Sequence, residues 1–437
     1  MAKKTKAADL SIEEKLEQAL VVPGYEPYKI PDNWCWTNLK TVCNLDNGIK
    51  HNNESLVYFD AKTLREITEP VSRNSGVIVE KGQKVILVDG ENSGEVFVIP
   101  DRGYMGSTFR ILNISKHFDE MYIRYFIDIF REELKKNKIG SAIPHLNKEL
   151  FYGLQFPLPP LPEQHRIVER IESLFSKLDE AKEKAQEVID SFETRKAAIL
   201  HKAFTGELTA KWREENGVGI ESWERKTLGE VCNSIFDGDH MPPPKSESGI
   251  PFLVISNVND GYLSFENTRF VPQEYYDAIT DTRKPEKGDV LYTLVGSFGI
   301  PVVVETNAPF CFQRHMALLK PKSINTYFLW YLLQSQEMYQ KASSIAKGVA
   351  QLTVPIKGLR LMDFNCPSEE EQIEIVRILD SLLEKEDTSK DNAESIIDQI
   401  ETMKKAILAR AFRGELGTND PEEESAVELL KQILSGE

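Results

Sequence analysis

The 437-residue sequence has little cysteine and no long apolar run. Its longest apolar stretches, such as 123–129, are interrupted by charge and fall far short of the roughly 20 residues that cross a bilayer. The N-terminus lacks the apolar core of a secretion signal, and the five cysteines are scattered without a CxxC pair. We therefore expect a cytoplasmic protein with reduced thiols and no membrane segment.

Recognisable catalytic motifs are also missing. The sequence contains no GxGxxG after a strand, no GxxxxGK[ST], no HExxH and no GxSxG, and it lacks the Asn-Pro-Pro-aromatic motif of amino-methyltransferases. The histidines are isolated from one another, and residues 237–240 are typical of a turn with solvated acids rather than of a metal site. We predict no catalytic residue and no bound metal, which argues against a self-contained DNA methyltransferase.

The net charge of −16 is unevenly distributed. Residues 369–437 contain 8 Lys and Arg against 19 Asp and Glu, whereas residues 31–160 contain 16 against 17. The acidity is therefore concentrated in the C-terminal part. A local basic face on a nearly neutral globular segment stays compatible with nucleic-acid binding.

The most informative feature present is an internal repeat. Residues 163–208 align without a gap with residues 371–416, and about half of the paired residues are identical. A period of this length is too long for a solenoid. It indicates a duplicated module with pseudo-two-fold character, in which two different globular domains are each followed by the same helical element.

Both repeated segments have the pattern of a coiled-coil helix. Apolar residues recur in steps of four and three, a 3.5-residue period, over roughly 37 residues or about 55 Å in the first copy. Because each helix supplies a matching apolar seam, we predict that the two pack on each other as an antiparallel coiled-coil spacer. The candidate residues for this seam and for subunit docking are Ile167, Ile171, Leu174, Leu178, Val188, Phe192, Phe204, Ile375, Leu379, Leu382, Ile396, Ile400 and Phe412.

The fold class that follows is α/β (α+β) with two β-rich domains. We divide the chain into an N-terminal extension with a short helix (1–30), a first β-rich domain (31–160), a central repeated helix (161–220), a second β-rich domain (221–368), a distal repeated helix (369–416) and an acidic tail (417–437). Ser11 with Glu14, and Ser368 with Glu371, have the spacing of capping boxes. The tail has an amphipathic face, which makes docking of a partner plausible.

Polar loops occupy corresponding positions in the two domains, 106–110 with 313–315 and 141–145 with 347–351. Their Arg, Gln, Asn, Ser and His side chains can bind base edges or phosphates, although such residues also occur in ordinary polar loops. The candidate DNA-binding residues are Asn92, Ser93, Ser107, Thr108, Arg110, Ser141, His145, Ser297, Gln313, Arg314, His315, Lys347 and Gln351.

Several motifs together resemble a known family. They are the Pro-Leu-Pro-Pro-Leu-Pro-Glu-Gln-x-x-Ile-Val run at 157–168, Ala-Phe-x-Gly-Glu-Leu at the end of both helices, Thr-Ala-Lys-Trp-Arg at 209–213 and the Trp34-type domain opening. From about residue 31 to 416 the chain resembles the specificity (S) subunit of a Type I restriction-modification system. The second copy departs from the pattern, because Cys-Pro-Ser-Glu-Glu-Glu-Gln at 366–372 replaces the proline-rich run.

The resemblance implies a non-catalytic chain that gives a multisubunit enzyme its DNA specificity. Each globular segment would be a target recognition domain that reads one half of a bipartite, asymmetric site in double-stranded DNA. The helices would set the gap between the half-sites and dock two modification (methyltransferase) subunits, and two restriction (translocase and nuclease) subunits would complete the complex. S-adenosylmethionine, ATP and Mg²⁺ would be used on those other subunits, with no cofactor on this chain.

Two alternatives stay open at this point. The chain is compatible with a specificity subunit of a different DNA-modification or phage-defence assembly. It is also compatible with an adaptor whose coiled coil joins two ligand-binding domains without DNA. The target bases cannot be derived from the sequence, since we know no residue-to-base code for such domains.

Overall fold

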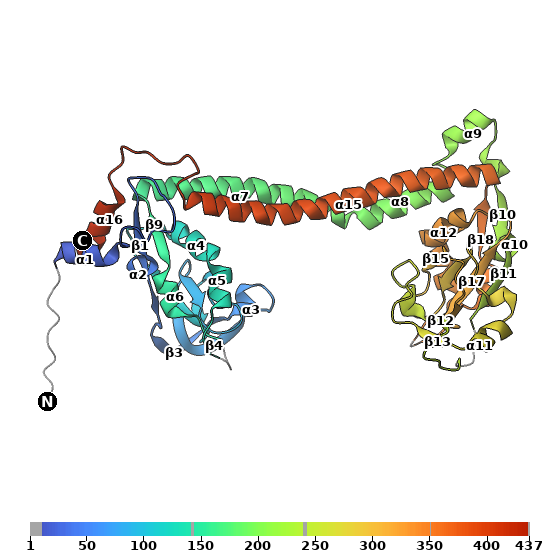
Figure 1. Cartoon of the computed structure of the whole chain (residues 1–437), viewed down its shortest axis with the longest axis horizontal. Coiled ribbons are helices and arrows are strands. Elements are labelled where there is room, and N and C mark those ends of the chain that lie inside the picture. Colours follow the sequence, from blue (N-terminus) through green and yellow to red (C-terminus); the bar gives the residue numbers. More distant parts are fainter. Residues whose placement is uncertain (1–10, 141–143, 239–242, 350, 436–437) are drawn as a thin grey trace. The chain divides into compact units, whose positions relative to one another are not determined.

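The computed structural model describes residues 11–140, 144–238, 243–349 and 351–435. The chain divides into unit 1, Met1–Lys184 with Ile396–Glu437, and unit 2, Ala185–Ser395. Each unit contains one β-rich domain and a stretch of both long helices (Figure 1). Unit 1 therefore includes N-terminal and C-terminal parts of the chain, which are far apart in sequence. None of the described helices has the length and apolar content needed to cross a membrane.

Unit 1 contains a four-stranded antiparallel sheet in the order β2-β8-β5-β6. Beside it, β3, β4 and β7 form a small closed barrel, and β1 pairs with β9, the strand that precedes the first long helix. The strands are β1 Cys35–Asn38, β2 Cys43–Asp46, β3 Lys50–Phe59, β4 Val71–Val79, β5 Lys84–Leu87, β6 Val96–Val98, β7 Gly103–Met105, β8 Phe109–Ile114 and β9 Gln155–Leu158.

Several helices of unit 1 share a core with the four-stranded sheet, and the first and last described helices of the chain pack on each other. They are α1 Ile12–Ala19, α2 Leu39–Val42, α3 Ala61–Leu64, α4 Glu120–Ile129, α5 Arg131–Lys136, α6 Lys148–Gly153, the first part of α7 Leu161–Asp190, the last part of α15 Glu369–Ala411, and α16 Ala426–Ser435. The capping box of Ser11 and Glu14 at α1 is confirmed. Helix α16 packs on α1 and buries Ala426 and Leu430 completely, so this chain itself covers much of the apolar face of the tail.

Unit 2 has the same kind of main sheet and strand pair as unit 1, but its third sheet differs. Its four-stranded sheet has the order β11-β17-β14-β15, and a β10-β18 pair takes the place of β1-β9. Along the chain, the strands of a three-stranded sheet, β13-β12-β16, come at the positions that the strands of the small barrel have in unit 1. The strands are β10 Glu224–Thr227, β11 Cys232–Asp237, β12 Ile250–Leu253, β13 Arg269–Val271, β14 Val290–Thr293, β15 Pro301–Val303, β16 Cys311–Phe312, β17 Met316–Pro321 and β18 Asp363–Cys366.

The core of unit 2 lies between its main sheet and a group of helices, with Phe204, Phe328 and Leu379 among its members. Besides its parts of α7 and α15, the helices of unit 2 are α8 Phe192–Phe204, α9 Ala210–Asn216, α10 Leu228–Val231, α11 Gln273–Ala278, α12 Thr326–Gln334, α13 Gln336–Ile345 and α14 Ile356–Arg360, with 3₁₀ turns η1 Ile220–Ser222, η2 Ile255–Asn257 and η3 Asp281–Arg283.

The first long helix is interrupted, contrary to the prediction of one continuous helix. Helix α7 ends at Asp190, α8 begins at Phe192, and Ser191 between them is a turn. The Ser191 hydroxyl donates to the Glu187 carbonyl oxygen at 2.5 Å and accepts from the Arg195 guanidinium. Such back-bonding by serine bends helices. The second helix, α15, runs through 43 residues without a break.

The antiparallel pairing of the helices is confirmed within each unit. In unit 1, Lys182 Nζ donates to Glu401 Oε1 at 2.8 Å, and the earlier Asp179 pairs with the later Lys404. In unit 2, Arg195 Nε donates to Glu386 Oε2 at 2.6 Å. Residue numbers rise on one helix where they fall on the other. Glu386 is a polar residue between the predicted apolar seam positions Leu382 and Ile396, and its ion pair across the helices explains its presence there.

The seam itself differs at one predicted position. Ile396 is 44% exposed, while Ala393 and Ile400 are buried and Ile397 is half-buried. The inward-facing residues here are therefore Ala393, Ile397 and Ile400, spaced by four and then three, and Ile396 is not part of the seam. The other seam residues are buried or half-buried: Ile167, Ile171, Leu174, Leu178, Val188, Phe192, Phe204, Ile375, Leu379, Leu382 and Phe412.

Candidate nucleic-acid interface

A buried Glu-Gln pair at the start of each long helix attaches the adjoining domain. Glu163 Oε2 accepts from the Trp34 indole Nε1 at 2.7 Å, and Gln164 Oε1 accepts from the backbone N–H of Asp119, the N-cap of α4, at 2.9 Å. Hydrogen bonds to buried groups are costly to lose, so these contacts orient the domain on its helix.

Unit 2 uses the same two residues in the same way. Glu371 Oε2 accepts from Trp223 Nε1 at 2.8 Å, and Gln372 Oε1 accepts from the N-cap Asn325 N–H at 2.8 Å. The other oxygen of Glu371 accepts from Arg213 at 2.6 Å. The predicted capping box at α15 is therefore only half formed: Ser368 Oγ accepts from the Glu371 N–H, but the Glu371 carboxylate is bound elsewhere.

Three loops of unit 1 meet at the end of β5. The Val88 N–H donates to the Thr108 carbonyl oxygen at 2.8 Å, and the Leu146 N–H donates to the Val88 carbonyl oxygen at 2.7 Å. Beside them, His145 Nδ1 lies 2.7 Å from Asp89 Oδ1. The predicted residues Thr108 and His145 are thus brought to one place. Ser141, predicted at the same place, lies outside the described residues.

The equivalent loops of unit 2 use the same backbone pattern. The Leu294 N–H donates to the His315 carbonyl oxygen at 2.8 Å, and the Val354 N–H donates to the Leu294 carbonyl oxygen at 2.9 Å. His315 therefore occupies the position of Thr108, in agreement with the loop correspondence that we inferred. The predicted residues Gln313 and Arg314 precede it on the same turn.

The second predicted loop correspondence is displaced by two residues. Lys347 and Thr353 exchange backbone hydrogen bonds of 2.9 and 2.8 Å, as Ile139 and His145 do in unit 1. His145 thus matches Thr353 and not Gln351. Lys347 and Gln351 are nevertheless exposed on this loop.

The remaining predicted residues lie on the turns that follow β5 and β14. Asn92 is half-buried and Ser297 is exposed. Ser93 is 0% exposed, because its turn packs against α5, where Leu134 is the nearest neighbour of Gly94. A fully buried side chain cannot contact DNA, so Ser93 is wrong as a contact residue. Its counterpart Phe298 is also buried.

A groove of about 570 Å³ in unit 1 contains two of the predicted residues, Ser107 and Arg110. An Arg110 terminal nitrogen donates to the backbone oxygens of Ser107 and Phe109 at 3.2 and 2.7 Å, which holds the guanidinium over the β7–β8 turn. The opposite wall carries residues that we did not predict. They are Lys50, Asn52, Arg73 and Ser75 of β3 and β4.

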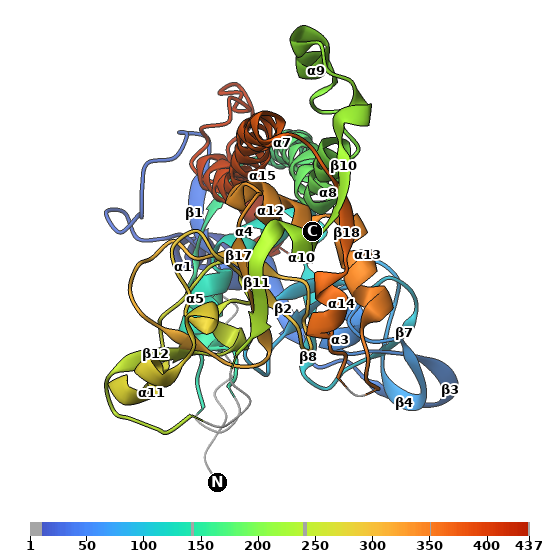
Figure 2. The same ribbon diagram turned by 90° about the vertical axis from the view of Figure 1, so that its right-hand side faces the viewer.

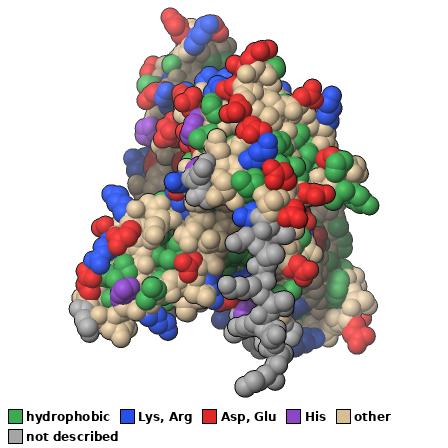
Figure 3. Space-filling model, turned by 90° about the vertical axis from the view of Figure 1, so that its left-hand side faces the viewer, with side chains coloured by type: hydrophobic (Ala, Val, Ile, Leu, Met, Phe, Trp, Pro, Cys, Tyr) green, Lys and Arg blue, Asp and Glu red, His purple; other side chains and the backbone are tan. Residues whose placement is uncertain are grey.

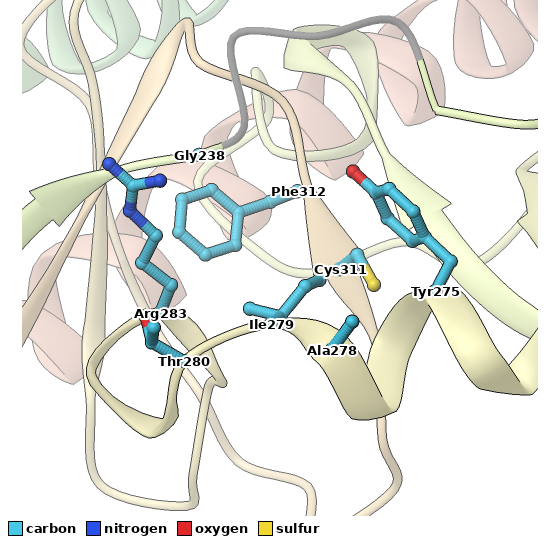
Figure 4. Close-up of a pocket in the computed structure, with 8 residues that line it drawn as sticks. All are labelled: Gly238, Tyr275, Ala278, Ile279, Thr280, Arg283, Cys311 and Phe312. Atoms are coloured by element: carbon cyan, nitrogen blue, oxygen red, sulfur yellow. The ribbon is translucent and has the colours of Figure 1, made fainter.

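The corresponding region of unit 2 holds a different cavity, with a volume of about 190 Å³ (Figure 4). Its walls come from α11, η3 and β16, and Figure 4 shows apolar side chains with Arg283 at one side. The Arg283 guanidinium lies 5.8 Å from the ring centre of Phe236 and 3.6 Å from Asp237. The lining residues are Gly238, Tyr275, Ala278, Ile279, Thr280, Arg283, Cys311 and Phe312. A common framework therefore carries chemically different surfaces in the two units.

Charge is mixed on the one face of the molecule that Figure 3 shows. On the side shown in Figure 3, acidic and basic side chains alternate. Burial, together with the nearby Arg314 charge, lowers the pKa of His315, so this side chain is neutral at neutral pH. Among the residues that the structure describes, no three His, Cys, Asp or Glu side chains are grouped as metal ligands.

Comparison with known proteins identifies the family to which this framework corresponds. The family model described as "Type I restriction modification DNA specificity domain" matches residues 31–190 and 220–401. The chain is 25% identical to the Type I restriction enzyme EcoBI specificity subunit of Escherichia coli, with 92% of each chain covered. It is 28% identical to the MjaVIII specificity subunit of Methanocaldococcus jannaschii, over 78% of this chain and 81% of that relative.

Solved structures agree in fold. A chain from a study of complex assembly and conformational transition of the type I R-M system matches with a TM-score of 0.67 at 22% identity, over 89% of this chain and 100% of that one. The HsdS subunit from Thermoanaerobacter tengcongensis matches with a TM-score of 0.59 at 22% identity, over 89% and 99%. The resemblance inferred from the repeated motifs is confirmed.

Proposed function

Because the chain belongs to the Type I restriction-modification DNA specificity family, we propose that it selects the DNA sequence on which a Type I complex acts. The observation that supports this most directly is the contrast between framework and surface. Both units share the Glu-Gln attachment and the loop hydrogen bonds, whereas several polar and cationic side chains line the groove of unit 1 and mostly apolar side chains line the cavity of unit 2. Two domains that read different half-sites need this combination.

Each domain then binds one half of a bipartite, asymmetric site in double-stranded DNA. Loops that follow strands in both domains supply Arg, Lys, Gln and Ser side chains, which serve as donors to phosphates and to base edges. The phosphate contacts give a salt-dependent affinity, while the base contacts give the sequence preference. An adaptor that joins two ligand-binding domains would also need two different surfaces, so it is the match to a DNA specificity domain that favours DNA binding over the adaptor.

The catalytic work belongs to partners. We propose two modification subunits, which bind S-adenosylmethionine and methylate adenine, and two restriction subunits, which use ATP and Mg²⁺. The duplication supports this number, because it provides two equivalent junctions between a helix start and a domain, at Glu163 and at Glu371. This chain contributes binding and positioning and performs no chemistry.

Coexpression of this chain with the modification subunit of the proposed complex tests the proposal. Single-molecule sequencing of the host DNA should show N6-methyladenine at one bipartite motif when this chain is present, and none at that motif when it is omitted. If a methyltransferase co-purifies but methylates the same motif without this chain, the specificity role is wrong. If no methyltransferase co-purifies and no motif is methylated, the adaptor or a different assembly becomes the better interpretation.

A further inference from the structure

The antiparallel ribbon of β3 and β4 is much longer than the corresponding pair of unit 2, β12 and β13. Residues 50–52 pair with 75–77 and residues 56–58 pair with 71–73, with a register shift in β3 between them. Strand β7 pairs with β3 at 57–59 and with β4 at 77–79, near opposite ends of the ribbon. The middle of the ribbon therefore pairs only with itself, and β3 and β4 extend at the edge of unit 1 in Figure 2.

One face of this ribbon is polar and faces the groove. Lys50 and Asn52 alternate along β3, and Arg73 and Ser75 alternate along β4, so the period of two places all four on the groove side. Ser107 and Arg110 line the same groove from the β7–β8 turn. The groove thus combines three cationic side chains with several neutral hydrogen-bonding groups.

The negative charge of the ribbon's one acidic residue, Glu54, is balanced by an arginine. Both oxygens of Glu54 accept from the Arg102 guanidinium, one of them at 3.0 Å, and these bonds hold the pKa of Glu54 below its usual range. Neither Lys50 nor Arg73 has a carboxylate within ion-pair distance among the residues that the structure describes. Although the chain carries a net charge of −16, this site presents unpaired positive charge.

Arg73 is held in one orientation without using its donors. Its guanidinium carbon lies 3.4 Å from the centre of the Tyr58 ring, so the planar group is stacked on the aromatic face. Stacking fixes the plane and leaves the N–H edge free for an acceptor pair. The side chain is exposed and lies in the segment of the ribbon that β7 does not cover.

We infer that the β3–β4 ribbon enters the major groove of DNA and that Arg73 determines a guanine in the half-site read by unit 1. A two-stranded ribbon fits the major groove of B-DNA, and a planar arginine edge matches the O6 and N7 acceptors of guanine. Lys50, a point charge near the end of the ribbon, contacts a phosphate and adds affinity without sequence preference. This assignment rests on the proposed function of the chain.

The test compares the methylated motif of the complete complex carrying wild-type chain with that of complexes carrying Arg73→Ala and Arg73→Lys. Lys40→Ala removes one exposed positive charge from α2 of the same unit and serves as the control. We expect both Arg73 variants to make one guanine position of the motif degenerate, while the other positions and the Lys40→Ala motif stay unchanged. We expect Arg73→Lys not to restore recognition of the guanine, because lysine keeps the charge but lacks the planar pair of donors.

A binding competition covers the case in which methylation falls below detection. Duplexes that carry the motif, with and without a G·C to A·T change at the assigned guanine, compete for the purified complex. The wild-type chain should discriminate between them by roughly 10- to 100-fold, and Arg73→Ala should lower this ratio to near one.

Four results overturn the inference. If Arg73→Ala weakens the binding of all duplexes equally, Arg73 contacts only phosphate. An unchanged motif in both variants, or degeneracy at a base other than guanine, excludes Arg73 as a guanine reader while leaving the proposed function intact. A wild-type complex without any bipartite motif overturns the proposed function, and this inference falls with it.

Discussion

The indole N–H of Trp34 donates to Glu163 at 2.7 Å in the buried interior of unit 1. This bond joins the residue before the first strand of the domain to the first turn of the long helix, 129 residues later. Asn419 Nδ2 donates to the same carboxylate oxygen at 2.8 Å, so the segment before α16 is fixed at the same point. A single carboxylate thus ties three distant parts of the chain together.

The equivalent carboxylate in unit 2 gives the first prediction. Glu371 is 1% exposed and pairs with the buried Arg213, so Glu371→Gln leaves a buried cation without its counter-ion. Loss of one partner of a buried pair costs about 3–5 kcal/mol. We expect faster amide hydrogen exchange in β10 and β18, with β1 and β9 unchanged. Glu369→Gln, on an exposed side chain in the same helical turn, is the control, and equal exchange in the two variants would contradict the prediction.

Much of this junction could be predicted from the sequence, and part of it could not. The identical pairs Glu163-Gln164 and Glu371-Gln372 marked these positions as repeated. The spacing of Glu371 from Ser368 suggested a capping box. The actual partners, Trp223 and Arg213, lie 148 and 158 residues away. Local spacing rules cannot identify such distant contacts, so the capping prediction was right for the Ser368 hydroxyl and wrong for the Glu371 carboxylate.

A second prediction concerns the C-terminal helix. Leu430 of α16 is fully buried in the core of unit 1, where α16 packs on α1. Leu430→Ala should destabilise unit 1 by about 2–5 kcal/mol, the usual cost of truncating a buried leucine. Thermal unfolding followed by circular dichroism should show an earlier transition, with a smaller effect of the half-buried Leu434→Ala. If the two variants unfold alike, the packing of α16 contributes little.

The site was harder to predict than the helices. Periodicity located the long helices, and the corresponding positions of polar residues in the two domains located the loops around Thr108 and His315. The β3–β4 ribbon has no such pattern: residues 50–55 are almost entirely polar, and a strand of that composition is indistinguishable from a loop until its partner is known. The role of Arg73 depends on Tyr58, a contact that only the folded ribbon creates.

The cysteines give a third prediction. Burial raises the pKa of the Cys35, Cys43 and Cys232 thiols to about 12. Because the thiolate is the reactive form, these residues should resist iodoacetamide at pH 8 in the native protein and react once urea unfolds it. Folding favours the neutral thiol, so this stabilisation is present below about pH 9 and is lost as the pH rises toward the folded pKa. Mass spectrometry of the labelled peptides measures the rate, and fast labelling of the native protein would refute the burial.

The last prediction concerns the gap between the half-sites. If the paired helices set that gap, seven residues inserted into α7 after Asp179 and into α15 after Lys404 should widen it, because these two residues face each other across the pair. A heptad preserves the 3.5-residue seam and adds about 10 Å at 1.5 Å per residue. With base pairs about 3.4 Å apart, the methylated motif should gain roughly three unread base pairs. Methylation mapping reads this directly. A seven-residue insertion in α7 alone, which disrupts the pairing with α15, should abolish methylation rather than shift the gap. If the double insertion methylates only the original spacing, the helices support the domains without measuring the distance between them.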